Sequence, residues 1–378
     1  MKIAIIGGGI AGLTAAIALK KAGLETVVFE AATDIKPAGA GLGLAPNAIK
    51  GLEKLGIADG IIPLGRKLPS FKILDRKGRV ITENDSNKIS EKFGLDNFTI
   101  HRHKLHAFLL SQLPPDTVIT GKKAMDLESA DGRKRIVFND GNVYETDYLI
   151  VADGMNSEIR NKIYPSAARR YAGYTCWRAV VNDPTNSITY ASETWDTTGR
   201  FGIVPLRGNQ IYWYACIKSR AANEVFKSYT AADLCRHFEN FHNPIKSILA
   251  ATQNNRLIHN DIYDLVPMAN YAFGNVLIMG DAAHGATPNL GQGACQAIED
   301  AATLYALLAE YLSLEKVFQS FEKRRIEKTH FVINQSRKVG EIAQLSSPFL
   351  AMLRNTALRL APRSIQERQF EKLYRVNF

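Results

Sequence analysis

The sequence predicts an α/β protein in which a doubly wound parallel sheet is interrupted by a mainly antiparallel sheet and followed by C-terminal helices. Three observations carry this prediction. A strand–helix–strand unit is complete within the first 30 residues, and short buried strands return at 148–152 and 276–279. Between residues 171 and 272 the pattern changes to alternating apolar and polar residues, which is typical of antiparallel strands.

The composition is that of an ordinary soluble globular protein. The chain has 378 residues, of which 46% are hydrophobic and 22% are charged, and this length suggests two domains. These values exclude collagen-like, intrinsically disordered and disulfide-scaffold proteins. The formal net charge of +10 attracts anions in general. Because a basic balance is common in enzymes, we expect no nucleic-acid partner.

The cysteines and the apolar runs indicate the compartment. The four cysteines lie far apart, and neither a Cys-x-x-Cys pair nor a histidine spacing completes a zinc set, so we expect reduced thiols and no metal. No run of about 20 apolar residues predicts a membrane span. Glycines interrupt the apolar run at 3–6, unlike a secretory signal. We therefore expect a cytoplasmic protein.

The N-terminal unit carries a dinucleotide-binding motif. Gly7-x-Gly9-x-x-Gly12 lies between an apolar strand and an alanine-rich helix, and Glu30 ends the next strand. The glycines allow a tight turn and the close approach of a pyrophosphate, while Glu30 can accept hydrogen bonds from a ribose hydroxyl. The alternative is a glycine-rich turn that binds nothing. The expected elements are a strand at 2–6, a helix at 13–22 and a strand at 26–30.

Turn dipeptides and changes of hydrophobic period separate the remaining elements. Prolines at 348 and 362 interrupt the basic, helical C-terminal part. We expect helices at 46–55, 103–112, 231–241 and 293–309, strands at 71–74, 80–82, 148–152, 174–181, 200–204, 210–217 and 276–279, and hairpin turns at 131–132 and 140–141.

A second motif points to a flavin. Gly280-Asp281 follows a buried strand, and the glycine-rich residues 288–294 lead into a long helix. A carboxylate at a strand end can bind the hydroxyls of a polyol chain, and the helix N-terminus can stabilise negative charge on an adjacent ring. Both features suit the ribityl chain and ring of a reduced flavin. The alternative is an aspartate that merely begins an alanine-rich helix.

Three segments together resemble a known family. They are GGGIAG at 7–12, VADGMNS at 151–157 and GDAAHGATPNLGQGACQAIEDA at 280–301. This set resembles the single-component (group A) FAD-dependent aromatic monooxygenases with the p-hydroxybenzoate hydroxylase fold. Within that family, NLGQGACQAIEDA and the segment RRYAGYTCWRAVV at 169–181 resemble bacterial FAD-dependent urate hydroxylase and plant zeaxanthin epoxidase.

The resemblance implies a division of the chain into domains. We expect a Rossmann-like FAD-binding domain built from residues 1–70, 100–170 and 273–330. A β-sheet substrate domain would comprise 71–99 and 171–272, and the helical segment 331–378 would follow.

The resemblance also implies the cofactor-binding residues. Arg102 matches a family arginine at the start of a helix near the FAD phosphates, although a solvated arginine is the alternative. Asp153-Gly154 matches a family motif that serves both FAD and the nicotinamide cofactor, with a plain turn as the alternative. We interpret His284 as structural. The implied FAD contacts are Gly7, Gly9, Ala11, Gly12, Glu30, Arg102, Asp153, Gly154, Asp281, Gly291, Gln292, Gly293 and Ala294.

The implied reaction is the hydroxylation or epoxidation of a small, electron-rich aromatic or heterocyclic compound. NAD(P)H would reduce FAD as a transient co-substrate, because the chain has a single dinucleotide motif. O₂ would then form a C4a-hydroperoxyflavin that transfers oxygen as an electrophile. Pro288 would lie at the flavin ring, and the protein would be a monomer or homodimer. A flavin oxidase or dehydrogenase that inserts no oxygen and a non-catalytic flavin-binding sensor are the alternatives.

The substrate side is less well determined by the sequence. Arg200 and Tyr212 match urate hydroxylase positions that contact or activate the substrate, and an arginine there could hold an anionic heterocycle. The alternative is a surface arginine and a core tyrosine. Residues 41–45 and 183–198 depart from urate hydroxylase, so a larger or more apolar substrate is plausible. Two further features stay open: three tryptophans, Trp177, Trp195 and Trp213, either line the cavity or pack the sheet, and the apolar and basic C-terminal stretch either packs on its own domain or touches a membrane.

Overall fold

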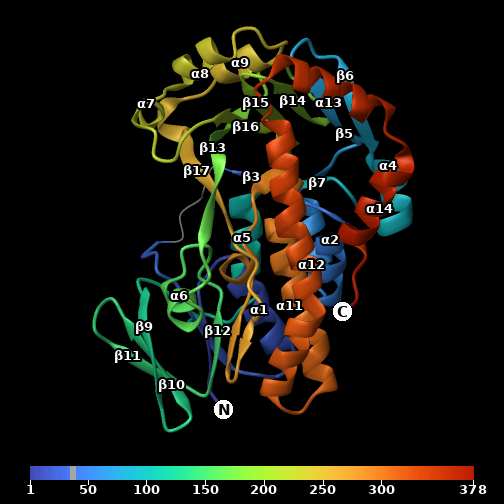
Figure 1. Ribbon diagram of the computed structural model, residues 1–378. Coiled ribbons are helices and arrows are strands. Elements are labelled where there is room, and N and C mark those ends of the chain that lie inside the picture. The colour runs from blue at the N-terminus through green and yellow to red at the C-terminus, as the bar shows by residue number, and fades with distance from the viewer. Residues whose placement is uncertain (35–39) are drawn as a thin grey trace.

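A computed structural model describes residues 1–34 and 40–378 (Figure 1). Its two large sheets lie at opposite ends of the molecule, and a long C-terminal helix, α12 (Leu314–Ala343), runs between them (Figure 1). None of the helices in these ranges is both long enough and apolar enough to cross a membrane.

The first sheet has six strands in the order β18-β19-β12-β1-β2-β8 and is parallel except for β18. Its central strand β1 is entirely buried and pairs on one side with β2 and on the other with β12. The strand order therefore changes direction at β1, and ligands of open α/β sheets bind at such a point. The strands are β1 (Ile3–Ile6), β2 (Thr26–Phe29), β8 (Val118–Ile119), β12 (Tyr148–Val151), β18 (Ala272–Phe273) and β19 (Val276–Ile278).

Helices and two small sheets pack around the first sheet and reach the second, where α4 contacts β5 and β6. The helix α11 packs on both α1 and α2, and the apolar residues of all three helices join the core of the first sheet. Residues 10–19 of α1 are all buried, so this helix is covered on every side. The helices are α1 (Ile10–Lys21), α2 (Pro46–Lys54), α3 (Ala58–Ile61), η1 (Ile62–Leu64), α4 (Ser86–Phe93), α5 (Arg102–Ser111), α6 (Glu158–Ile163), α10 (Asp281–His284), η3 (Pro288–Leu290) and α11 (Gly293–Glu310), and the small sheets comprise β3 (Gly41–Leu44), β4 (Arg66–Lys67) and β7 (Phe98–His101), and β9 (Ala124–Ala130), β10 (Arg133–Phe138) and β11 (Val143–Thr146).

The second sheet has seven strands in the order β17-β13-β16-β15-β14-β5-β6. It is antiparallel except where β14 pairs with β5. One face is covered by α7, α8 and α9 over an apolar core, and the other face turns toward the first sheet. The elements are β5 (Ser70–Asp75), β6 (Val80–Asp85), β13 (Arg169–Asn182), β14 (Ala191–Asp196), β15 (Gly199–Leu206), β16 (Gln210–Lys218), β17 (Ile258–Leu265), α7 (Glu224–Lys227), α8 (Ala231–His237), α9 (Ile245–Ala250) and η2 (Asn254–Arg256).

The C-terminal helices tie the two parts together. α12 packs along α11 and also contacts β13 and β17 of the second sheet. The boundary expected at residue 330 falls inside this continuous helix, since no proline or glycine interrupts it there. After it come α13 (Pro348–Leu360) and α14 (Arg363–Tyr374), which are separated at Pro362 as the sequence predicts.

The predicted α/β class and most predicted elements are confirmed. Sequence reasoning missed several elements whose short or mixed patterns show no clear period, among them α3, α4, α6, α9, β3, β7, β14 and β17. The strand expected at 174–181 is longer, because β13 begins at Arg169 and continues through an irregularity in its pairing with β17.

Candidate active site

The glycine-rich turn after β1 is built for close contact. Gly7 has a φ of +101°, and a Cβ on it would lie 2.4 Å from the Ala152 carbonyl oxygen. A Cβ on Gly12 would lie 1.8 Å from the Gly7 carbonyl oxygen, so only glycine lets α1 pack here. Around Gly9, by contrast, there is open space. That opening is where the backbone can approach a pyrophosphate.

Glu30 is held at the edge of this turn. Its two carboxylate oxygens accept hydrogen bonds from the backbone N–H groups of Gly8, at 2.7 Å, and Ala32, at 2.8 Å. His106, on α5, contacts the Gly8 carbonyl oxygen at 2.7 Å, a support that sequence reasoning missed. Arg102 lies exposed at the first position of the same helix.

Asp153, directly after β12, has an unsatisfied buried oxygen. Its Oδ1 is buried and has no hydrogen-bond partner in the part of the chain that the structure describes. Burial raises the pKa of Asp153 to about 6. A buried acceptor without a donor is costly and calls for a ligand group. The adjacent start of α1 has neither a side-chain cap nor an acidic residue in its first turn. Together these features fit the hydroxyl and phosphate groups of FAD.

The second motif meets the first in space. Gly280 has a φ of +62°, and a Cβ on it would lie 2.5 Å from the Cβ of Ala11. Asp281 begins α10, and its Oδ1 would lie 3.7 Å from a Cβ on Gly293, the first residue of α11. The start of α11, like that of α1, has no side-chain cap and no acidic residue in its first turn. The two predicted motifs therefore form one continuous site.

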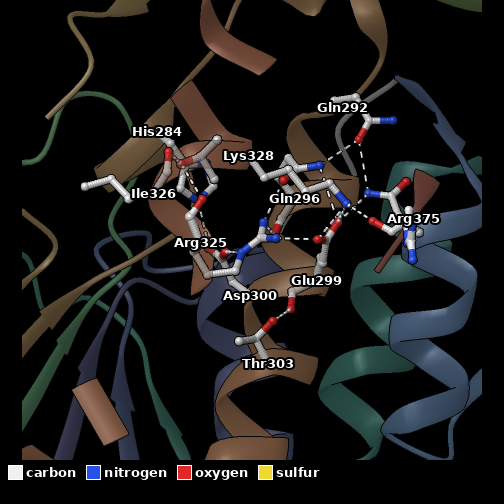
Figure 2. Close-up of polar contacts among 12 residues, drawn as sticks. His284, Gln292, Gln296, Glu299, Asp300, Thr303, Arg325, Ile326, Lys328 and Arg375 are labelled. Atoms are coloured by element: carbon white, nitrogen blue, oxygen red, sulfur yellow. Dashed lines mark hydrogen bonds and ion pairs between the residues drawn. The ribbon is translucent and has the colours of Figure 1, made fainter. Parts of the chain in front are cut away.

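A buried ionic network supports this second motif, and Figure 2 shows it. Asp300, on α11, accepts hydrogen bonds from the Gly280 N–H at 2.9 Å, His284 Nε2 at 2.7 Å and Arg325 Nε at 2.7 Å. Burial alone would raise the pKa of Asp300, but His284 and Arg325 outweigh it and hold that pKa below its usual range. His284 is thus a buried partner of a structural carboxylate, as the sequence interpretation has it.

The same network fixes the glycine-rich loop before α11. Glu299 accepts hydrogen bonds from Asn47 at 2.8 Å, from Lys328 and from Arg325 (Figure 2). Asn47 also donates to the side-chain oxygen of Gln292 at 3.1 Å. Gln292 is buried, and its side-chain oxygen accepts hydrogen bonds from Asn47 and Gln296, so the network fixes this side chain through its oxygen.

Arg200 lies on the face of the second sheet that turns toward the first. It is 2% exposed and donates from Nη1 to Oε1 of Glu193, which is 6% exposed, at 3.0 Å. The other Glu193 oxygen accepts from the Tyr214 hydroxyl at 2.7 Å. Arg200 is therefore not a surface residue, and its charge is neutralised by a carboxylate that sequence reasoning missed.

Asn289 joins this sheet to the loop that precedes α11. Its Oδ1 accepts hydrogen bonds from Arg200 Nη2 and from the Tyr174 hydroxyl, the latter at 3.0 Å. Its Nδ2 donates to the Ser336 carbonyl oxygen on α12 at 2.9 Å. The side-chain amide of Asn289 therefore joins the second sheet and α12 to the loop before α11. Pro288 precedes Asn289 directly in this loop.

Tyr212 lies on the same face of the second sheet as Arg200 and packs against strand β3. Tyr212 pairs with Val204 across strands β16 and β15, whereas Arg200 pairs with Cys216, so the two predicted substrate residues share a face without being neighbours. A Cβ on Gly41 of β3 would lie 2.7 Å from the Tyr212 Cβ. Burial raises the pKa of Tyr212, so its hydroxyl stays protonated near neutral pH.

Two of the three tryptophans lie away from the face that carries Arg200. Trp177 and Trp213 lie in the apolar core on the opposite face of the second sheet. The Arg354 guanidinium lies over the indole ring of Trp195, with its carbon Cζ 5.0 Å from the ring centroid.

The cysteines are free thiols, and no cluster of His, Cys, Asp or Glu that could hold a metal occurs within residues 1–34 and 40–378.

Comparison with known proteins assigns the family. The family profile described as "FAD binding domain" matches residues 1–335, which include all three sequence motifs. The chain belongs to this FAD-binding family. Together with its relatives, this membership makes the chain an FAD-dependent monooxygenase of the group that acts on aromatic and heterocyclic compounds. The oxidase and sensor alternatives gain no support.

The match between this chain and similar members of the FAD-binding family extends over nearly the whole length of both proteins. The chain is 31% identical to the aurachin C monooxygenase/isomerase of Stigmatella aurantiaca, over 95% of this chain and 94% of that protein. It is 33% identical to the 2-heptyl-3-hydroxy-4(1H)-quinolone synthase of Pseudomonas aeruginosa, over 99% of this chain and 98% of that protein. The crystal structure of Klebsiella pneumoniae HpxO complexed with FAD and uric acid matches with a TM-score of 0.90 at 28% identity, over 99% and 96%.

Proposed function

We propose that this monooxygenase hydroxylates an uncharged bicyclic heteroaromatic, a 4(1H)-quinolone that carries an apolar chain at C2. Two relatives support the proposal, since one is named for a 2-heptyl-3-hydroxy-4(1H)-quinolone and another for aurachin C. The overall change is substrate–H + O₂ + NAD(P)H + H⁺ → substrate–OH + H₂O + NAD(P)⁺.

The pairing of Arg200 with Glu193 carries the proposal. An arginine that holds an anionic substrate must keep its charge and donors available. Here Nη1 donates to a buried carboxylate and Nη2 to Asn289, which leaves only the buried Nε without a partner among the described residues. An added anion would therefore meet a pair of zero net charge. Burying a further unpaired charge beside such a pair is unfavourable. An uncharged substrate avoids this cost.

The chemistry of a 4-quinolone fits such a neutral site. Its C3 lies next to the carbonyl carbon and is conjugated with the ring nitrogen, so it is nucleophilic without deprotonation by the protein. Bound FAD, reduced by NAD(P)H, supplies an oxygen atom from O₂ in electrophilic form. The protein's task is to orient C3 and to exclude water.

We assign the donors on the second sheet to the substrate's carbonyl oxygen. Tyr212 keeps its hydroxyl proton. Arg178, which lies on the neighbouring strand β13 and interacts with Tyr212, is half-buried on the same face of the second sheet. Arg178 already donates to an amide oxygen, Oδ1 of Asn260, at 2.8 Å, and a guanidinium donates equally well to a ring carbonyl. Pro288 would border the ring site, and Arg200 would position the Asn289 loop.

We assign FAD to the continuous site formed by the two motifs. Gly7, Gly9, Ala11 and Gly12 would cradle the pyrophosphate, with Glu30 at the adenosine ribose. Asp153, Asp281 and the start of α11 would hold the polar groups of the flavin half. The proposed cofactor contacts are Gly7, Gly9, Ala11, Gly12, Glu30, Arg102, Asp153, Gly154, Asp281, Gly291, Gln292, Gly293 and Ala294.

Urate is the second candidate substrate. The HpxO structure is similar over 99% of this chain, and its ligand, uric acid, is a heterocycle that is ionised at neutral pH. Urate and the quinolone differ in charge, which makes them separable by experiment.

The test is a comparison of 2-heptyl-4(1H)-quinolone, urate and 3-amino-4-hydroxybenzoate at equal concentration. We expect the quinolone to stimulate NAD(P)H oxidation at least about tenfold, with little peroxide and a hydroxylated product by mass spectrometry. Stimulation by urate with formation of a hydroxylated product, and none by the quinolone, would contradict the substrate assignment.

A variant pair sharpens this test. Glu193→Gln uncovers the charge of Arg200, so the KM for the two anionic compounds should fall relative to that for the quinolone. Tyr214→Phe is the control, because it removes the other hydrogen bond to Glu193 without changing the charge. An equal effect of both variants on the three KM values would argue against a charge-based selection.

We also propose that the enzyme works in the cytoplasm as a monomer or homodimer, with O₂ as its oxidant. The absence of a helix able to cross a membrane in the described ranges is compatible with this location.

A further inference from the structure

The C-terminal helix α13 presents large apolar side chains to solvent. Phe349 is 63% exposed and Leu360 is 76% exposed. Leu350, Met352 and Leu353 on the same helix are also exposed, as is Ile365 at the start of α14. A concentration of this kind on one element is unusual for a soluble surface and marks an interaction site. We call these six residues the α13 apolar face.

The orientation of α13 is fixed with this face outward. The residues of the helix that are buried are Ala351 and Arg354, the reverse of an ordinary amphipathic helix. Arg354 stacks on Trp195 and donates hydrogen bonds to the carbonyl oxygens of Ile342 and Ala343. The apolar face is therefore not an effect of a frayed chain end, because a buried guanidinium anchors the opposite side.

The surroundings of the α13 apolar face are basic. Residues 342–366 contain no Asp or Glu. A groove of about 450 Å³ separates α13 from the turn between β5 and β6, and exposed Arg76, Lys77 and Arg79 line it together with Arg359. Two carboxylates also line the groove, and both are paired: Asp75 with Arg79 and Arg359, and Asp196 with Arg76. Because the lining has five cationic side chains, Arg354 among them, its net charge stays positive. In Figure 1 this region lies at the end of the molecule opposite the β9–β11 sheet, clear of the first sheet and its motifs.

We propose that α13 docks the protein on an anionic phospholipid surface. The α13 apolar face would enter the boundary between headgroups and acyl chains, and the basic groove would take phosphate-bearing headgroups beside it. Apolar area and positive charge together are what a helix needs to lie in such an interface. A neutral protein partner would use the apolar residues but not the cations. The inference rests on α13 and its groove, and it stands whatever the substrate is.

The test is co-sedimentation of the full-length, FAD-loaded protein with extruded vesicles. Phosphatidylcholine vesicles are compared with vesicles that also contain phosphatidylglycerol, at low and high salt, and the bound fraction is read from flavin absorbance and protein. We expect strong binding to the phosphatidylglycerol vesicles only, reversed by salt. Leu350→Ser/Leu353→Ser should weaken it at least about tenfold, and Lys77→Gln about fivefold.

Val225→Ser/Leu312→Ser is the matched control, since both side chains are exposed and apolar but lie outside α13. This control should bind like the wild type, and all variants should keep their flavin. Equal or absent binding to the two vesicle types would overturn the proposal. So would a dimer in sedimentation velocity that Leu350→Ser/Leu353→Ser dissociates, with no vesicle binding, because a second copy would then cover the face.

Discussion

Arg200 shows how much a single residue's meaning depends on its partners. From the sequence it resembles a substrate-binding arginine, whereas in the fold it lies between Glu193 and Asn289. The register of β14, β15 and β16 creates this arrangement, and register across strands cannot be obtained from local patterns. From the arginine alone one would infer a site that binds anions, whereas the pair of Arg200 and Glu193 makes the site neutral.

A double-mutant cycle tests the buried pair. Arg200→Met or Glu193→Gln alone leaves one buried charge uncompensated and should lower the free energy of unfolding by about 3–5 kcal/mol. The double variant should lose much less, which makes the coupling between the two sites large and positive. Urea denaturation of the apoproteins gives these values. Additive losses would mean that the two side chains do not form a pair.

The pH dependence of the apoprotein tests Asp153. Its pKa is raised from 3.8 to about 6 by burial, so between these values the native state binds more protons than the unfolded state and stability falls as the pH rises. Above pH 6 the buried carboxylate costs up to about 3 kcal/mol. Asp153→Asn should therefore be more stable than wild-type apoprotein at pH 8 and equal to it at pH 4. Parallel stability curves of the two proteins would refute the burial of this charge.

At the scale of elements, the dinucleotide motif and the strands around it are predictable because their signals are local. The glycine spacing, the apolar β1 and the acidic end of β2 lie within one stretch of chain. The network around Asp300 and Arg325 is not predictable in this way, since α11 and α12 bring its members together from separate segments. Its members look like ordinary charged helix residues in the sequence.

Gly9 and Gly12 differ in what they do for the β1–α1 turn. A Cβ on Gly12 would overlap the Gly7 carbonyl oxygen, whereas one on Gly9 would enter open space. Gly9→Ala should therefore leave the stability of the apoprotein within about 1 kcal/mol of wild type and yet weaken FAD binding at least about tenfold. Gly12→Ala should impair both. Flavin retention and thermal unfolding distinguish the two, and equal effects would contradict the different roles.

Arg325 tests the support of the second motif by α12. Its removal leaves Asp300 and Glu299 without their main counter-charge, at a cost of about 3–5 kcal/mol. We expect Arg325→Gln to unfold at lower urea and to release FAD more readily. The exposed Lys323→Gln, on the same helix, is the control and should change the free energy of unfolding by less than about 1 kcal/mol. Similar losses in both variants would indicate a general effect on α12.

At the scale of the whole molecule, the second sheet, the loop before α11 and α12 converge on Asn289. This convergence places the Arg200 side of the second sheet beside the start of α11, where the flavin ring is assigned. The sequence predicts the two sheets and their places along the chain, but not which residues join one sheet to the other. Docking depends on side chains such as Asn289 and Glu193, which carry no distinctive spacing in the sequence.

The most direct test of the central claim is the fate of molecular oxygen with the quinolone. Purified, FAD-loaded protein is incubated with NAD(P)H, 2-heptyl-4(1H)-quinolone and ¹⁸O₂, and the product is analysed by mass spectrometry. The account predicts a hydroxylated quinolone that carries one ¹⁸O atom, formed in step with NAD(P)H oxidation. Consumption of NAD(P)H that yields only labelled hydrogen peroxide and unchanged quinolone would contradict it.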